Sequence, residues 1–165
     1  MSTISIRPIR SEDDARIASI IRSCLNEFEA PTCGSALGDP EIDFMSRAYS
    51  GERSAYFVAE ENGVILGGAG IAQLENANSD TCELRKMYLS KQARGKGVGN
   101  GLMQKCLEIA RSFGFEYCYL ETFPTMLDAQ KLYKRSGFYY LDASKGGTGH
   151  TACTVWMQND LNHAD

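Results

Sequence analysis

Arg94-Gly95-Lys96-Gly97-Val98-Gly99 carries the strongest structural signal in this sequence. It follows an extended run at residues 81–89, and the apolar residues after it recur at helical spacing until Gly114, a natural left-handed cap. Its alternate glycines remove Cβ atoms where the free N–H groups of a helix start point outward. The helix dipole and the two basic side chains favour negative charge there. The stretch therefore predicts a strand-to-helix junction that binds a phosphate or pyrophosphate.

Two common phosphate-binding motifs do not fit this glycine loop. The Rossmann pattern fails because Leu102 stands three residues after Gly99, and the P-loop pattern fails because Gly97 follows the lysine where Ser or Thr is needed. A nucleotide-phosphate binder without acyl chemistry is therefore disfavoured. A flexible loop with incidental basic residues is the alternative that the local string leaves open.

The chain before the glycine loop predicts strands and two helices in a defined order. Ser11 with Asp14 is a helix-start signal, and Asn62-Gly63 between extended runs is a hairpin signal because both residues tolerate positive φ. The predicted elements are an edge strand near residues 4–8, a helix with an apolar stripe at 17–28, a shorter helix at 42–49, and strands at 55–60, 64–74 and 81–89.

The chain after the loop continues the alternation. Its predicted elements are a helix at 98–113, a strand at 116–122, a helix opened by Thr125 with Asp128 and ended by Gly137, and strands at 138–141 and 151–157 joined by a glycine-rich loop. The order β-α-α-β-β-β-α-β-α-β-β predicts an α/β fold with a central mixed, mostly antiparallel sheet. No repeat or linker divides the chain, so we expect one domain over residues 1–165.

Size and charge exclude several classes of protein. The chain has 165 residues, of which 43% are hydrophobic and 23% charged, so it is long enough and apolar enough to bury a core without disulfide or metal staples. Its formal net charge of −4 opposes a nucleic-acid-binding surface except as a local basic patch. We therefore expect no nucleic-acid partner.

Cysteine and histidine usage bears on compartment and metals. The six cysteines form no Cys-x-x-Cys pair, and several fall in apolar periodic segments, as buried reduced thiols do. No apolar run is long enough for a signal peptide or a membrane span, so we expect a cytoplasmic protein without a membrane partner. The two histidines, His150 and His163, lie near no cysteine cluster, so no metal is expected.

Two separated blocks of the sequence resemble the GCN5-related N-acetyltransferase (GNAT) family. The first is Arg94-x-x-Gly97-x-Gly99 after the strand at 83–89, and the second is Leu120-Glu121-Thr122 followed by Ala129-x-x-Leu132-Tyr133-x-x-x-Gly137-Phe138. The resemblance implies the GNAT fold and direct transfer of acetyl from acetyl-coenzyme A to an amine in a ternary complex. The acceptor is a small-molecule or peptide amine of unknown identity. A non-catalytic acyl-coenzyme A sensor is the alternative function.

The resemblance also implies which residues hold acetyl-coenzyme A as cosubstrate. In the family, the fourth strand binds the pantetheine arm through its backbone, and the glycine loop holds the pyrophosphate. The implied cofactor-binding residues are Met87, Tyr88, Leu89, Arg94, Gly95, Lys96, Gly97, Val98, Gly99, Asn100 and Met126. Met126 departs from the family pattern, which often has an asparagine there, so its role is either contact with the arm or acceptor, or filling of the core.

Two catalytic roles follow from the resemblance. Tyr133 stands where the family usually has the acid that protonates the departing thiolate, and Glu83 matches a position that bears the base in several members. A core tyrosine and a solvated strand-end carboxylate are the structural alternatives. Glu121 and then His150 are the next candidate bases. The acceptor wall is expected from the first two helices and the loop at 145–150, and because family members often dimerise, a homodimer is one expectation.

Overall fold

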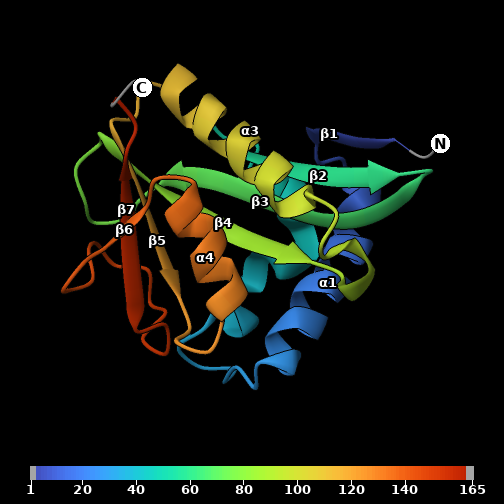
Figure 1. The fold of residues 1–165 in the computed structure, drawn as a ribbon, viewed down its shortest axis with the longest axis horizontal. Helices are drawn as coiled ribbons and strands as arrows, with labels where there is room; N and C mark the ends of the chain where they lie inside the picture. Colours follow the sequence, from blue (N-terminus) through green and yellow to red (C-terminus); the bar gives the residue numbers. More distant parts are fainter. Residues whose placement is uncertain (1–2, 163–165) are drawn as a thin grey trace.

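The computed structural model describes residues 3–162 and contains one seven-stranded sheet (Figure 1). The order across the sheet is β1-β2-β3-β4-β5-β7-β6, and of the pairs among the described residues only β4–β5 is parallel. The predicted mixed, mostly antiparallel sheet is therefore confirmed. The strands are β1 (Ile4–Pro8), β2 (Ala55–Glu61), β3 (Val64–Gln73), β4 (Thr81–Leu89), β5 (Tyr117–Thr122), β6 (Tyr139–Tyr140) and β7 (Val155–Asp160).

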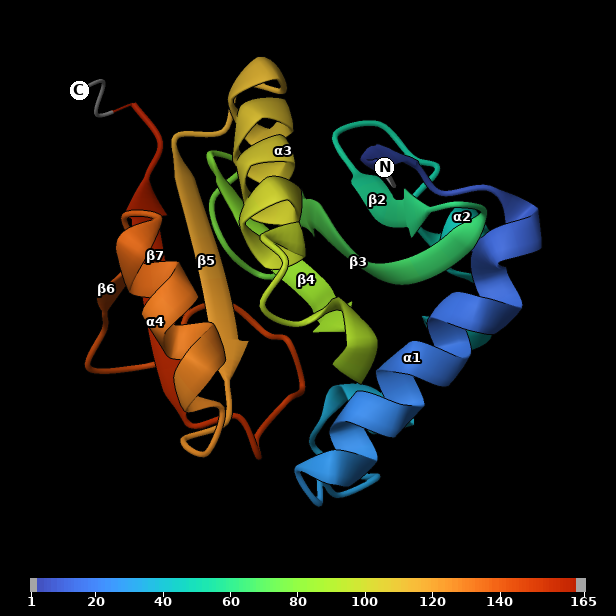
Figure 2. The same cartoon turned by 45° about the vertical axis from the view of Figure 1, so that its right-hand side comes forward.

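Helices cover both faces of the sheet, α3 and α4 on one face and α1 with α2 on the other (Figures 1 and 2). The predicted order of helices and strands is confirmed. The helices are α1 (Asp14–Glu27), α2 (Met45–Ala48), α3 (Val98–Ser112) and α4 (Leu127–Arg135), with 3₁₀ turns η1 (Ser11–Asp13), η2 (Ala36–Gly38), η3 (Pro40–Phe44) and η4 (Lys91–Ala93).

Two apolar clusters form the core, one on each face. The cluster under α1 buries Ile17, Ile21 and Leu25 at the predicted spacing, whereas Phe28 ends the helix and is only half-buried. The cluster under α3 likewise buries Val98, Leu102, Cys106 and Ala110. Burial of each stripe favours folding by about 25 cal/mol per Å² of apolar surface, which ties both helices to the sheet.

The predicted hairpin is confirmed, whereas two predicted boundaries and the form of one predicted helix are wrong. Asn62 and Gly63 have φ of 52° and 81°, as a two-residue turn with positive φ requires. Thr125 does not cap α4, which begins at Leu127 without a side-chain cap. The last strand starts at Val155 rather than at residue 151, because the residues before it form a turn in which the Cys153 amide donates to the His150 carbonyl at 3.0 Å. The second helix is a 3₁₀ turn followed by one turn of α-helix.

A β-bulge interrupts β4 halfway along its length. Gly68 pairs with Tyr88 and Gly70 with Arg85, so Lys86 and Met87 together oppose one residue of β3. Lys86 has φ of 52°, in the left-handed region that is costly for a residue with a Cβ.

The Tyr56 hydroxyl supports the bulge by donating a hydrogen bond to the Lys86 carbonyl at 2.7 Å. Glycine makes room for this tyrosine, because a Cβ at Gly68 or Gly70 would lie 2.5–2.6 Å from its ring. The glycine-rich sequence of β3 is therefore a packing requirement of the bulge.

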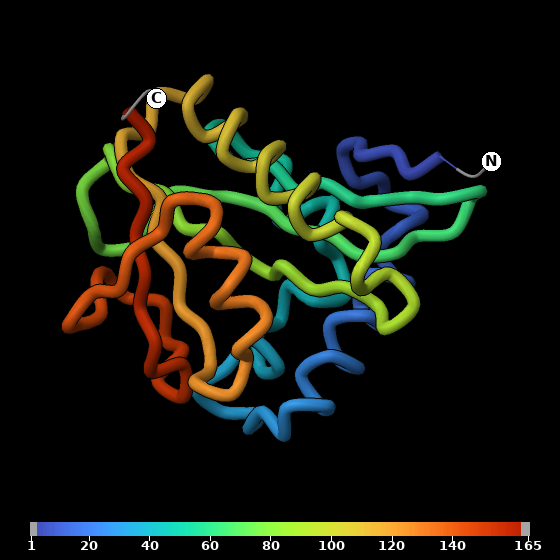
Figure 3. Tube along the Cα trace, in the orientation of Figure 1, coloured from blue at the N-terminus to red at the C-terminus, as the bar shows by residue number. Residues whose placement is uncertain are grey.

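Two long connections meet beside the sheet, the segment between α1 and η3 and the β6–β7 loop (Figure 3). The Ala152 amide donates to the Gly34 carbonyl at 2.8 Å, which joins them. The fold therefore brings residues near 39 and near 150 to one place.

We expect Asp13 to stabilise the start of α1 in a pH-dependent way. Its buried carboxylate accepts hydrogen bonds from the Arg7 guanidinium at 2.8 and 3.0 Å and from the Arg10 amide at 2.8 Å. Burial raises the pKa of Asp13, but these hydrogen bonds outweigh burial and lower it. A carboxyl whose pKa is lowered by folding adds stability above its unfolded pKa, and this is lost as the pH falls through the folded value.

Asp13→Asn should therefore lower the free energy of unfolding by about 2 kcal/mol at pH 7, and the loss should shrink below about pH 4. Urea unfolding at pH 7 and pH 3 measures both values. Glu12→Gln is the matched control, because Glu12 is exposed and 3.9 Å from Arg10, and should cost less than about 0.5 kcal/mol. Equal losses for Asp13→Asn at both pH values would contradict the prediction.

Candidate active site

β4 and β5 pair over only three residues and then diverge. Thr81, Cys82 and Glu83 pair with residues 117–119, although β4 continues to Leu89 and β5 to Thr122. Figure 2 shows the two strands separating beyond this point. The backbone of β4 that faces β5 after Glu83 therefore has no strand partner. Residues 87–89, assigned to the pantetheine arm, lie in this stretch, where Tyr88 and Leu89 keep their pairing with β3 and the Leu89 carbonyl accepts a hydrogen bond from Cys24 Sγ at 3.0 Å.

The divergence of β4 and β5 after Glu83 forms a fork. At its wide end, the glycine loop presents a row of backbone N–H groups that are free to bind a ligand. None of the N–H groups from Gly95 to Asn100 donates a well-formed hydrogen bond to the described residues 3–162. Gly95 and Gly97 have φ of 78° and 79°, and a Cβ on either would meet nothing within 4 Å. Successive amides of this kind form an anion-binding concavity at the start of α3. The loop therefore fits the diphosphate of acetyl-coenzyme A.

The basic side chains of the loop are engaged elsewhere. Arg94 donates to both Glu27 carboxylate oxygens at 2.8 and 3.0 Å, and this pairing lowers the pKa of Glu27. The Lys96 ammonium lies 3.6 Å from Glu61. The sequence did not predict these pairings. The positive groups that face the loop are thus mainly backbone amides. Val98 and Gly99 are buried beneath the loop, where a Cβ at Gly99 would lie 3.1 Å from Leu132.

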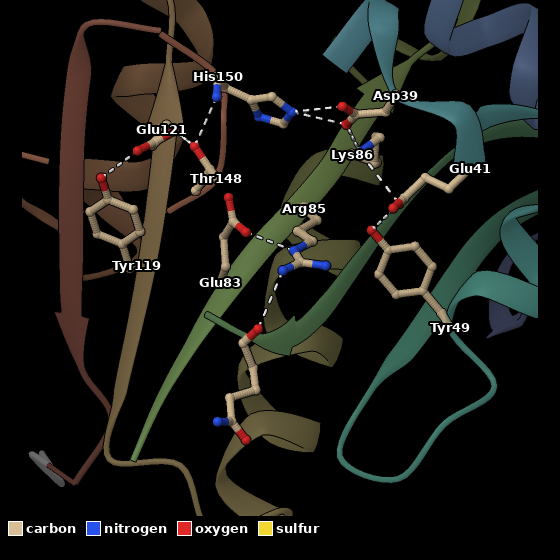
Figure 4. A network of polar contacts seen from close by, with 11 residues as sticks. Asp39, Glu41, Tyr49, Glu83, Arg85, Lys86, Tyr119, Glu121, Thr148 and His150 are labelled. Atoms are coloured by element: carbon tan, nitrogen blue, oxygen red, sulfur yellow. Dashed lines mark hydrogen bonds and ion pairs between the residues drawn. The ribbon is translucent and has the colours of Figure 1, made fainter. Parts of the chain in front are cut away.

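The three candidate bases lie together at the closed end of the fork (Figure 4). Glu83 from β4, Glu121 from β5 and His150 from the β6–β7 loop each place one oxygen or ring nitrogen within 4.8 Å of the others. The sequence indicated these residues separately and did not predict that they would meet.

Each member of this cluster is held by a specific partner. Glu83 is 5% exposed and accepts a hydrogen bond from Arg85 Nε at 2.7 Å. Burial raises the pKa of Glu83, because it outweighs the opposing charge of Arg85. Glu121 accepts hydrogen bonds from the Tyr119 hydroxyl at 2.6 Å and from the hydroxyl of Thr148.

Asp39 holds His150, a contact that the sequence analysis missed. The His150 Nε2 lies 2.9 and 3.1 Å from the two Asp39 oxygens, and Lys86 Nζ donates to Asp39 at 2.6 Å. Burial raises the pKa of Asp39, but the hydrogen bonds from His150 and Lys86 outweigh it and the pKa is lowered. The one local signal was Asp39 before Pro40, a common helix start, which says nothing about a partner 111 residues away.

Tyr133 approaches the fork from α4. Its ring is buried and lies 5.9 Å from the Phe138 ring, and its hydroxyl makes no hydrogen bond with the described residues. Burial, with a smaller effect of Cys153, raises the pKa of Tyr133 to about 12, so the phenol stays protonated at physiological pH. Met126 lies at the start of α4, and its sulfur accepts a hydrogen bond from Thr122 at 3.5 Å.

Comparison with known families decides the identity of the fold. Residues 17–138 match the family model described as the acetyltransferase (GNAT) family. The chain belongs to this family. The resemblance of the two sequence blocks is therefore confirmed, and with it the assignment of the chain as an N-acetyltransferase.

Similar proteins agree with this membership. The GNAT chain is 39% identical to the uncharacterized N-acetyltransferase YjgM of Escherichia coli over 157 aligned residues. The alignment covers 94% of each chain. A GNAT-family acetyltransferase from Staphylococcus aureus superposes with a TM-score of 0.85 at 21% identity, over 97% of this chain and 100% of that one. YncA of Salmonella typhimurium, solved with acetyl-CoA, gives a TM-score of 0.77 at 20% identity, over 99% and 96%.

Metal binding and membrane insertion can both be assessed on the described residues of this GNAT chain. Glu83, Glu121 and His150 are close enough to hold a metal ion, but all three already have hydrogen-bond partners in protein side chains. The absence of a metal stays a prediction. Within residues 3–162, no helix combines the length and apolar character needed to cross a bilayer.

Proposed function

We propose that this GNAT enzyme transfers acetyl from acetyl-coenzyme A directly to an amine at the fork between β4 and β5. One observation carries the proposal: the fork has open backbone amides at its wide end and the Glu83–Glu121–His150 cluster at its closed end. The first set suits a diphosphate, and the second suits an amine that must lose a proton.

Acetyl-coenzyme A, when bound, supplies the thioester carbon that the amine attacks. The amides of residues 95–100 hold the diphosphate, with Arg94 and Lys96 near it, and the β5-facing backbone of residues 87–89 orients the arm. Met126 lies beside the pantetheine arm. Holding both reactants in line is worth roughly 7 to 11 kcal/mol of barrier, more than acid–base help of about a hundredfold to ten-thousandfold.

Glu83 acts as the base that removes the proton from the acceptor. An alkyl amine with a pKa of about 10.4 is almost entirely protonated at pH 7, so a base increases the reactive fraction. Because burial raises the pKa of Glu83, its carboxylate is a stronger base than an exposed glutamate. Tyr133 holds a proton at a hydroxyl that no group among residues 3–162 hydrogen-bonds, ready for the departing thiolate.

Thiol release measured over a panel of amines tests the proposal. We expect release that depends on both acetyl-coenzyme A and one class of amine, and a loss of about a hundredfold or more in turnover for Glu83→Gln. The wild-type rate should rise with pH through the raised pKa of Glu83, because the deprotonated form is the base. A chain that binds acetyl-coenzyme A but releases no thiol with any amine would instead be a non-catalytic sensor.

Gly97→Glu should abolish binding of acetyl-coenzyme A, because the new carboxylate fills and charges the proposed diphosphate site. Gly114→Glu is the matched control at the other end of α3, since Gly114 has φ of 87° and open space around it, as Gly97 has. Both variants carry similar backbone strain, so any difference in their affinities for acetyl-coenzyme A, measured by calorimetric titration, comes from the position of the new carboxylate. Retained affinity in Gly97→Glu would refute this location for the diphosphate.

Tyr133→Phe should lower turnover by on the order of a hundredfold while leaving acetyl-coenzyme A affinity and thermal stability nearly unchanged. The reason is that the hydroxyl bonds to nothing in the part of the chain that the structure describes, so the substitution keeps the ring packing. Tyr140→Phe is the control, because its hydroxyl donates to Gln130 at 2.8 Å on the exposed edge strand, and it should keep wild-type turnover. Equal turnover in Tyr133→Phe and the wild type would remove Tyr133 from the mechanism.

A further inference from the structure

We propose that Asp39 is a positioning residue for the transfer: it holds the Nε2–H of His150, so that the unprotonated Nδ1 faces Glu83 and Glu121 and accepts the proton that Glu83 takes from the amine. The inference rests on the proposed function and adds to it a route for the proton. Neither the sequence nor the family resemblance assigns a role to Asp39.

The contact between Asp39 and His150 fixes the tautomer of the ring. An ionised carboxylate only accepts hydrogen bonds, so Nε2, which lies 2.9 and 3.1 Å from its two oxygens, must carry the proton. In a neutral imidazole the other nitrogen, Nδ1, is then the acceptor. Figure 4 shows the His150 ring between Asp39 on one side and the two glutamates on the other.

The low solvent exposure of Glu83 explains why it needs a neighbour that passes its proton to solvent. The Glu83 side chain is 6% exposed, whereas those of His150 and Asp39 are 17% and 24% exposed. A proton received by Glu83 is therefore enclosed by protein, and His150, which like Glu121 is half-buried, offers it a route toward solvent. The separation of up to 4.8 Å between their atoms is one that a single bridging water spans.

The β4 bulge keeps Asp39 in position. Lys86, whose side chain is 3% exposed, donates to Asp39 at 2.6 Å and lies 3.4 Å from Glu41. Because Lys86 sits at the bulge, its ammonium reaches across to the segment before η3. Asp39 is thus fixed from one side by Lys86 and presented to His150 on the other.

The charged groups around the His150 ring come from three segments, and a fourth adds a hydroxyl. Asp39 lies just before η3 and Glu41 lies in it. The β4 groups are Glu83, Arg85 and Lys86, and β5 contributes Glu121. Thr148, on the β6–β7 loop, accepts a hydrogen bond from the His150 backbone N–H at 3.1 Å. Asp39 is the group in this set that hydrogen-bonds a ring nitrogen. Its removal should therefore affect the ring more than removal of Glu41.

The proton balance of the proposed step is simple. The N–H bond of the acceptor breaks as an O–H bond forms on Glu83, and that O–H bond breaks as an N–H bond forms at Nδ1 of His150. The imidazolium, held by the Asp39 carboxylate, then releases the proton to solvent. No electron transfer or further reactant is involved.

A double-mutant cycle tests whether Asp39 acts through His150. Asp39→Asn should lower kcat about tenfold to a hundredfold with the KM for acetyl-coenzyme A within about twofold. In a His150→Gln background the same substitution should have almost no further effect, because the route is already broken. Glu41→Gln removes the other carboxylate near Lys86 and should keep wild-type kcat. Losses from Asp39→Asn and His150→Gln that multiply would overturn the inference.

Nitrogen-15 NMR of histidine-labelled protein gives a readout without substrate. The chain has two histidines, so His150→Gln assigns the signals of residue 150. We expect the Nε2–H tautomer in the wild type and a mixture of tautomers in Asp39→Asn; an Nδ1–H tautomer in the wild type would overturn the inference. Failure of the proposed function is distinguishable, because the wild type then releases no thiol, whereas failure of this inference leaves wild-type turnover intact.

Discussion

The broken pairing between β4 and β5 is the constraint on which the rest of this structure depends. Backbone groups that lose a strand partner are costly unless something else satisfies them, so a sheet does not open without support. Here the support comes from both sides: β5 stays paired with β7 over residues 117–122, and β4 stays paired with β3 on either side of its bulge. The apolar cluster under α3 reaches both halves of the sheet and holds them together.

The bulge and the fork both shape the candidate site, from opposite edges of β4. On the β5 edge, the pairing with β5 ends at Glu83, and the proposed ligand lies along the edge beyond it. On the β3 edge, the extra residue lets Arg85 and Lys86 reach different acidic partners, Glu83 and Asp39 respectively. The strand thus carries the edge proposed to bind the ligand and the charge pairs that organise the cluster beside it, and Gly68 and Gly70 of β3 leave room for Tyr56 at the bulge.

Local signals were predictable from the sequence and distant contacts were not. The loop at residues 94–99, the hairpin at Asn62 and the helical stripes depend on neighbouring residues, and each was found. The meeting of Glu83 with His150, and the pairing of Arg94 with Glu27 across 67 residues, depend on how far-apart segments pack, which composition and spacing do not encode. The start of β7 was misjudged for the same reason, because Ala152 before it bonds to the distant Gly34 carbonyl instead of continuing the strand.

The pairing of Arg94 and Lys96 with acidic partners has a consequence for how this protein tolerates ionic strength. Salt screens full charges over about 8 Å under physiological conditions, but fixed amide dipoles in contact with an anion are affected far less. In the proposed function, a cradle built mainly from N–H groups should therefore let a chain with a net charge of −4 retain a polyanion in concentrated salt. It does so without a basic surface that would also attract unrelated polyphosphates.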